Sequence, residues 1–356
     1  MDQGELPVYR PVRLDRDYLA EKALDQFGRK HPGYWRTTSA FQKMRILEEF
    51  RDLISNLEES LATDDPAFFI DHSCWAEVHL TALHFPKNHE SLIINTLDEV
   101  LKKELPLDFR RQSGSFIAQT LTALKNTSTE IPSSITADNP HADVARSFLA
   151  AVITGNQEEA GRMFEDAVRS GIPVKNIYIH VFLPVLQETG RLWQLQQIGI
   201  AQEHFVTATV ETLMARLHNR FLSSIERRKG MTVIAASVGM ELHDVGIRMV
   251  ADFFEMDGWD TYYTGANTPV QGILDAVQDR KPDIIALSTT IPHHLPDVQH
   301  LIRSLRGGDR GMTKGKIIVG GYPFRTVPDL WKRIGADAYA GTAADAVAVA
   351  NRLVSQ

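Results

Sequence analysis

The N-terminal third of the chain repeats apolar side chains at the spacing of an α-helix. Between Met44 and Leu61, for example, apolar residues recur every three or four positions and so share one helical face. Leu105-Pro106 ends one of these patterns, because proline cannot continue a helix. The pattern predicts an all-helical domain at 1–130, with helices over 17–30, 39–63, 65–84, 90–105 and 109–124.

A second helical region follows a segment rich in Ser, Thr, Pro and Asn at 126–140, whose composition indicates a linker. Gly155 and Gly171 stand where the C-terminal ends of two helices are expected. The region 141–227 therefore predicts a four-helix bundle, with helices over 143–155, 157–171, 175–194 and 201–221.

Beyond residue 231 the period changes to short apolar runs that alternate with amphipathic helices. Five such units in about 125 residues indicate a flavodoxin-like, doubly wound parallel sheet at 231–356, which binds ligands at the carboxyl ends of its strands. The expected strands are 231–239, 260–265, 283–290, 316–322 and 336–341, and helices are expected to begin near Asp244, Pro269, Leu295, Val327 and Ala343. The predicted fold class is a multidomain α and α/β protein.

Composition narrows the possible function classes. The 356 residues are 43% hydrophobic and 23% charged, which is typical of a folded protein of two or three domains. A net charge of −7 with scattered basic residues argues against direct DNA binding. The single cysteine, Cys74, excludes an intrachain disulfide, and no apolar run approaches a membrane span or a signal peptide. We therefore expect a cytoplasmic protein.

The loop after the first expected strand carries a candidate ligand. His243 follows that strand and so lies at the edge of the sheet where ligands bind, Asp244 is able to cap the next helix, and Gly246 allows a bulky group to approach. An exposed histidine in an ordinary strand-to-helix turn is an equally good interpretation of this loop by itself.

Spacing favours the functional interpretation. Ser288 follows Gly246 after 41 residues, and a later strand ends in Gly320-Gly321. This pattern over 231–356 resembles the cobalamin-binding domain family. The resemblance implies that His243 is the lower axial ligand of cobalt and that Ser288, Gly320 and Gly321 line the groove for the nucleotide tail. The family pattern also has a carboxylate two residues before the histidine, and this carboxylate orients the imidazole ring.

Two positions depart from the family pattern. Glu241 stands where Asp is commoner, and its longer side chain is expected to reach the histidine by a different rotamer. Thr290 stands where Leu is usual, which weakens the assignment of the tail groove without affecting the domain.

A second motif lies in the bundle, where Trp193 is followed after nine residues by Glu203-His204. A core tryptophan and a solvated helix start would explain this pattern by itself. Beside a cobalamin domain, it resembles the light-sensing adenosylcobalamin repressors of the CarH type. The resemblance implies that Trp193, Glu203 and His204 contact the adenosyl group. Those repressors have a histidine where this chain has Gln194, so a bis-histidine photoproduct is doubtful here.

The repressors' N-terminal DNA-binding domain is replaced by the helical region, which has no basic recognition helix. Phe68, His72, Trp75 and His79 fall on one helical stripe that could line a pocket, although ordinary aromatic packing explains them as well.

The helical pattern of residues 1–130 resembles a globin-like sensor domain, and such a domain before a cobalamin light-sensing module resembles the photocobilins, which implies biliverdin as a second chromophore. Candidate partners for its propionates are Arg36, Arg45, Arg51, His72 and His79, and Trp75 is included in the pocket. Cys74 is the one residue able to form a thioether, although an unreactive thiol is the simpler expectation.

The leading hypothesis is a non-enzymatic light sensor that binds adenosylcobalamin and forms a light-dependent homo-oligomer. Biliverdin is the candidate second chromophore. The main alternative is a corrinoid methyl carrier of a methyltransferase system, whose upper cavity need hold only a methyl group. An adenosylcobalamin mutase subunit is a third hypothesis, but nothing in the chain resembles the barrel that binds mutase substrates.

Overall fold

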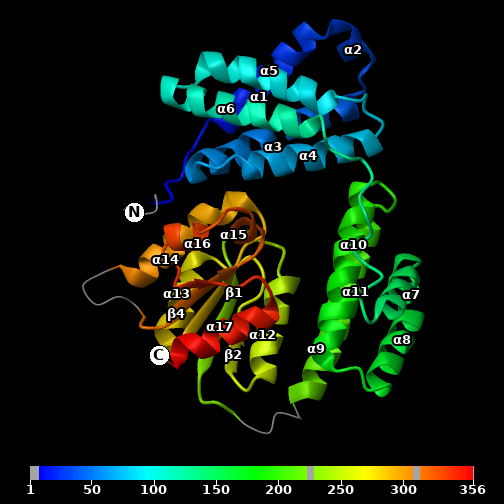
Figure 1. Ribbon diagram of the computed structural model, residues 1–356, viewed down its shortest axis with the longest axis vertical. Coiled ribbons are helices and arrows are strands. Elements are labelled where there is room, and N and C mark those ends of the chain that lie inside the picture. The colour runs from blue at the N-terminus through cyan, green and yellow to red at the C-terminus, as the bar shows by residue number, and fades with distance from the viewer. Residues whose placement is uncertain (1–7, 223–227, 308–312, 356) are drawn as a thin grey trace. The chain divides into compact units, whose positions relative to one another are not determined.

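The computed structural model describes residues 8–222, 228–307 and 313–355 (Figure 1). The chain forms two compact units. The first contains the helical N-terminal region and most of the sheet, and the second contains the bundle and part of one helix of the sheet domain. The first unit comprises Met1–Thr127, Thr232–Arg248 and Tyr262–Gln356, and the second Ser128–Met231 and Met249–Thr261. The boundaries of the three expected domains stay predictions.

The N-terminal region is all helical, as the apolar periodicity predicts. Its apolar faces share one core, in which Phe27 packs edge-on against Phe50. The sequence analysis missed α2, because a six-residue helix that begins with proline is too short to show a period. The helices are α1 (Arg16–Lys30), α2 (Pro32–Thr37), α3 (Ala40–Thr63), α4 (Ala67–Ala82), α5 (His89–Glu104) and α6 (Leu107–Leu124).

The second unit contains the helical bundle. Gly155 and Gly171 have φ of 78° and 84°, the left-handed conformation expected at helix ends. The helices are α7 (Ala142–Ile153), α8 (Gln157–Arg169), α9 (Val174–Ile177), η1 (Tyr178–Phe182), α10 (Leu183–Gln194) and α11 (Ile200–Leu222).

The third expected helix of the bundle runs as α9, η1 and α10, and η1 is a π-helical turn. Pro184 follows this turn and has no N–H to donate to the carbonyl of His180. That carbonyl accepts a hydrogen bond from the Asn139 side chain instead, at 2.8 Å. The linker residue thus satisfies an acceptor that the proline leaves open.

The sheet has five strands in the order β2-β1-β3-β4-β5, the flavodoxin-like order, and its β1–β3, β3–β4 and β4–β5 pairs are parallel. This confirms the predicted fold class. The strands are β1 (Thr232–Ser237), β2 (Asp260–Tyr263), β3 (Ile284–Ser288), β4 (Lys316–Gly320) and β5 (Ala338–Tyr339).

Helices connect these strands as predicted, except that two short helices flank the position near Val327 where one was expected. The connecting helices are α12 (Val245–Met256), α13 (Val270–Arg280), η2 (Pro292–His294), α14 (Leu295–Arg306), α15 (Tyr322–Thr326), α16 (Leu330–Arg333) and α17 (Ala343–Val354).

Within the first unit, the segment before α1 packs between the helical region and the sheet. Tyr9 is fully buried; its hydroxyl donates to Glu59 of α3 at 2.5 Å, and its carbonyl accepts from Gln299 of α14 at 2.8 Å. Arg333 also donates to the carbonyl of Thr63, at 2.7 Å. Hydrogen bonds between residues more than 200 positions apart therefore join the two parts.

Glu59→Gln is expected to change how stability depends on pH. Burial, the largest cause, raises the pKa of Glu59 from 4.5 to about 7. Between those values the folded chain binds more protons than the unfolded chain, so this group stabilises the fold at low pH. That contribution, at most about 3 kcal/mol, is lost as the pH rises through 7. Denaturant unfolding at pH 5 to 8 should show a flatter pH dependence for Glu59→Gln than for the wild type. The same dependence in both would contradict this assignment, and exposed Glu21→Gln is the control.

Candidate functional site

One buried carboxylate, that of Glu241, organises the carboxyl edge of the sheet. Its Oε1 accepts from the backbone N–H of His243 at 3.0 Å and lies 2.6 Å from the ring Nδ1 of the same residue. Its Oε2 accepts from the backbone N–H groups of Thr290 and Ile291 at 2.7 and 2.9 Å, and His294 Nδ1 lies 3.3 Å away. Glu241 therefore joins the loop after β1 to the loop after β3.

These donors keep Glu241 ionised. Burial by itself raises the pKa of Glu241, but hydrogen bonds from His243, His294 and backbone amides outweigh burial and hold the pKa far below its ordinary value. A carboxylate acceptor requires a proton on Nδ1 of His243, so the neutral ring has its lone pair on Nε2. The His243 side chain is 61% exposed. This geometry suits a metal ligand that binds from outside the sheet.

The longer Glu side chain reaches His243, as the sequence analysis expected. Thr290 takes part through its backbone N–H. Asp244 begins α12 through its carbonyl, which accepts from Arg248 N–H at 2.9 Å, while its carboxylate accepts from the Tyr263 hydroxyl at 2.5 Å. The side-chain contact of Asp244 thus runs to the end of β2.

The neighbouring strand ends carry small and hydroxyl side chains. Ser288 aligns with Ser237 on β1 and with Gly320 on β4. The Ser237 Oγ is buried and has no hydrogen-bond partner, which is unusual for a buried hydroxyl. Gly246 is exposed, and a Cβ there would meet no atom within 4 Å. The two hydroxyls at the strand ends and the open surface at Gly246 fit a polar group that lies against this edge of the sheet.

The second unit brings the bundle residues together at one end of a helix pair. Trp193 is half-buried near the end of α10, and Glu203 and His204 lie near the start of α11, which packs against α10. Glu203 Oε2 lies 2.7 Å from His204 Nδ1, and His204 is 73% exposed. Gln194 is buried beside Trp193 in sequence. Their role toward an adenosyl group stays a prediction.

The expected stripe on α4 is divided between two environments. The rings of His72, Trp75 and His79 stack in sequence, with centroid distances of 6.4 and 4.9 Å. Phe68 instead packs toward the sheet, 6.2 Å from the ring of Tyr322. The histidines of the stripe therefore belong to the interior of the helical region and not to one continuous groove with Phe68.

The other candidate bilin residues have protein partners. Arg45 pairs with Glu48 at 2.5 Å, Arg51 with Asp17 at 2.8 Å, Arg36 donates to the carbonyl of Pro32 at 3.2 Å, and the Cys74 Sγ accepts from the Thr127 hydroxyl at 3.2 Å. These contacts explain the residues without a pigment.

The sequence analysis missed three residues that contact the candidate site residues or the helices beside them. His294 contacts Glu241, and its neighbour His293 has Nδ1 4.0 Å from Glu58 Oε2 of α3. The Pro292-His293-His294 run after the third strand was the available signal. Glu49, which bonds to His72 at 2.8 Å, looked like an ordinary member of a charged helix.

Two family models match the chain. Residues 231–350 match a model described as B12 binding domain, and residues 144–218 match a second model with the same description. The chain therefore contains a cobalamin-binding module that includes the bundle and the sheet. Neither match covers residues 1–143.

Similar proteins include several corrinoid proteins and one repressor. Dimethylamine corrinoid protein 1 of Methanosarcina acetivorans is 28% identical over 173 residues, which are 48% of this chain and 76% of that protein. The HTH-type transcriptional repressor CarH of Myxococcus xanthus is 27% identical over 205 residues, 57% of this chain and 66% of the repressor. These values do not separate light sensing from methyl transfer.

A solved structure agrees with the fold. The Methanosarcina barkeri monomethylamine corrinoid protein aligns with a TM-score of 0.52 and 19% identity, covering 60% of this chain and 99% of that chain. Among the described residues, no helix has the length and apolar character that crossing a bilayer requires.

Gly321→Ala is expected to destabilise the sheet domain strongly. Gly321 has φ 105° and ψ −179°, a region that only glycine adopts readily, and a Cβ would lie 1.9 Å from the Thr289 carbonyl oxygen. Gly155→Ala is the matched control, because φ is also positive there but a Cβ would meet no atom within 4 Å. In denaturant unfolding we expect a loss of more than about 3 kcal/mol for Gly321→Ala and about 1 kcal/mol for Gly155→Ala. Equal losses would show that the close approach to Thr289 is unimportant.

Proposed function

We propose that this protein is an adenosylcobalamin-binding light sensor in which His243 is the lower axial ligand of cobalt. It acts by binding and signalling and not as a catalyst. The observation that supports the cobalamin site most directly is the exposed His243 ring held through Nδ1 by the buried, ionised Glu241. That arrangement orients a ligating imidazole and increases its basicity.

The strand ends would hold the rest of the cofactor's lower side. The hydroxyls of Ser237 and Ser288 would hydrogen-bond a polar tail, and Gly320 and Gly321 let neighbouring backbone segments pack closely around the end of β4. Glu241 keeps the loops that flank this groove together, because both are bound to the same carboxylate. The groove is thus preorganised by the protein.

The bundle residues support adenosyl as the upper group. Adenosylcobalamin, when bound, supplies a weak cobalt–carbon bond that visible light cleaves. Trp193 would pack on the adenosyl group, with Glu203 and His204 at the same end of the helix pair. Loss of that group removes contacts from one arrangement of α10 and α11, and so shifts the balance between arrangements. Such a shift is expected to change assembly of the homo-oligomer.

A physical path leads from the ligand loop to the N-terminal helices. His294 contacts Glu241, and the adjacent His293 faces Glu58 of α3. The other oxygen of Glu58 accepts from the Leu14 backbone N–H at 2.5 Å. A displacement of His243 would therefore act on the helical region through η2, which makes that region the candidate output element.

A corrinoid methyl carrier is the second candidate, because the dimethylamine corrinoid proteins are as similar to the module as the repressor is. A methyl group does not require the Trp193, Glu203 and His204 set. We leave biliverdin out of the proposal, because His72 and His79 are stacked on Trp75 and none of the relatives described above is named as a bilin protein.

Illumination should change both spectrum and assembly. The full chain, purified in the dark with adenosylcobalamin, is expected to change its absorption and its mass by light scattering after green light. Trp193→Ala should reduce the mass change at least severalfold, whereas Trp331→Ala, another half-buried tryptophan, should not. Gln194→His should alter the illuminated spectrum by offering an upper imidazole.

The same preparation also tests the second candidate, a corrinoid methyl carrier. Unchanged spectrum and mass after light would refute the sensor, and transfer of methyl from bound methylcobalamin to a thiol would identify a carrier. Both outcomes leave cobalamin binding itself intact.

His243→Ala should remove the lower nitrogen ligand. Electron paramagnetic resonance of the bound cobalt(II) form is expected to show splitting by one nitrogen in the wild type and in His300→Ala, an exposed control on α14. His243→Ala should lose that splitting, and Glu241→Gln should weaken binding at least tenfold because the imidazole loses its carboxylate. A retained splitting in His243→Ala would reject the axial assignment.

A further inference from the structure

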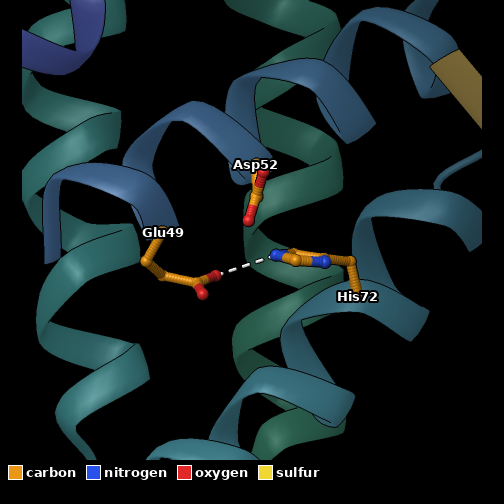
Figure 2. A group of neighbouring side chains, drawn as sticks. All are labelled: Glu49, Asp52 and His72. Carbon is orange, nitrogen blue, oxygen red and sulfur yellow. Dashed lines mark hydrogen bonds and ion pairs between the residues drawn. The ribbon is translucent and has the colours of Figure 1, made fainter. Parts of the chain in front are cut away.

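Three potential metal ligands converge in the N-terminal helical region, away from the loop of His243 in the sequence. Glu49 and Asp52 lie one turn apart on α3, and His72 faces them from α4 (Figure 2). His72 Nε2 lies 2.8 Å from Glu49 Oε1, and one ligand atom from each of the three residues lies within 4.8 Å of the others. The three side chains can therefore reach one ion with small rotations.

The surroundings fix this geometry and leave an entrance. Glu49 is 4% exposed, and the His72 ring stacks on Trp75, so both have little freedom. Asp52 is exposed, which gives an ion access from solvent. The positive charge of Arg45 favours the ionised form of Asp52, but the Arg45 side chain itself forms an ion pair with Glu48 at 2.5 Å.

A separate observation concerns buried polar atoms on α5 that have no hydrogen-bond partner. Glu90 of α5 is fully buried, and neither of its carboxylate oxygens has a hydrogen-bond partner. The Nε2 of its neighbour His89 is also buried and without a partner. Of the charged groups around them, Glu49 has the largest effect on the pKa of Glu90 and on the pKa of His89. Buried polar groups are rarely left unsatisfied, so the unpartnered Glu90 carboxyl favours a ligand that brings positive charge into the interior around Glu49.

We propose that Glu49, Asp52 and His72 bind a divalent first-row transition-metal ion such as Zn²⁺. Two carboxylate oxygens and one imidazole nitrogen are a donor set for such ions, whereas Mg²⁺ and Ca²⁺ prefer oxygen ligands alone. Three protein ligands leave a fourth position for water on the exposed side. Glu90 would balance the charge of the ion from within the core.

The site would link α3 to α4, the helices that contact the sheet domain. Glu58 and Thr63 of α3 and Asp71 of α4 make those contacts, the last with the Tyr322 hydroxyl at 2.7 Å. Metal occupancy would thus stabilise the packing of the helical region on the sheet. The metal site does not depend on the proposed light response.

A second cluster serves as the internal control. His218, Asp252 and Glu255 in the second unit also have ligand atoms within 4.8 Å. There both Asp252 oxygens already have a protein partner, the Tyr178 hydroxyl at 2.5 Å and His218 Nδ1 at 3.0 Å. We therefore expect His218→Ala to bind metal as the wild type does.

The test is Zn²⁺ binding to the full chain, purified without cobalamin and stripped by a chelator. Calorimetry and metal analysis after desalting should give one tightly held Zn²⁺ per wild-type chain. Asp52→Asn should weaken binding at least tenfold, and His72→Ala should abolish it, whereas His218→Ala and Asp98→Asn should not change it. Zn²⁺ should raise the melting temperature of the wild type and not of Asp52→Asn.

Asp52 is exposed, so its substitution tests the site even where His72→Ala fails to fold. Equal Zn²⁺ affinity in the wild type and Asp52→Asn, or loss of binding in His218→Ala alone, would overturn the proposal.

Discussion

The hydrogen bonds to the Glu241 carboxylate are the constraint on which the ligand edge depends. A carboxyl group with no exposed surface stays ionised only when its oxygens are satisfied, and here backbone and histidine donors from two loops meet on one group. Removing one side of such a buried interaction typically costs about 3–5 kcal/mol. The position of His243 is therefore a property of both loops and not of the first loop by itself.

Three buried glutamates in the first unit show how the number of donors sets the state of a carboxyl group. Glu241 has several donors, and its pKa is held far below the ordinary value. Glu59 has the Tyr9 hydroxyl, and burial raises its pKa to about 7. Glu90 has no hydrogen-bond partner, and burial raises its pKa well above the ordinary value. Similar side chains at similar depth are thus suited to orienting a ligand, packing two elements, and balancing a bound cation.

The bundle and the sheet form a module that corrinoid proteins and a repressor also contain, so the module by itself does not define the function. Two features of this chain bear on which function the module has here. One is the set of Trp193, Glu203 and His204 at one end of α10 and α11. The other is the helical region, which packs on the sheet through Tyr9 and Glu59. The physical contact of this region with the ligand loop, through His293 and His294, makes it part of the site's surroundings.

The sequence by itself determined most of the helices, the five strands, the parallel sheet and the residue spacing of the ligand loop, because periodicity, helix caps and βα alternation are local properties. It also placed Glu241 two residues before His243. Only the tertiary structure decided that His294 shares the Glu241 carboxylate, that Tyr9 is buried between α3 and α14, and that Glu49 meets His72. These contacts join residues 23 to 290 positions apart, and no local pattern encodes such pairs because they form only when separate elements pack.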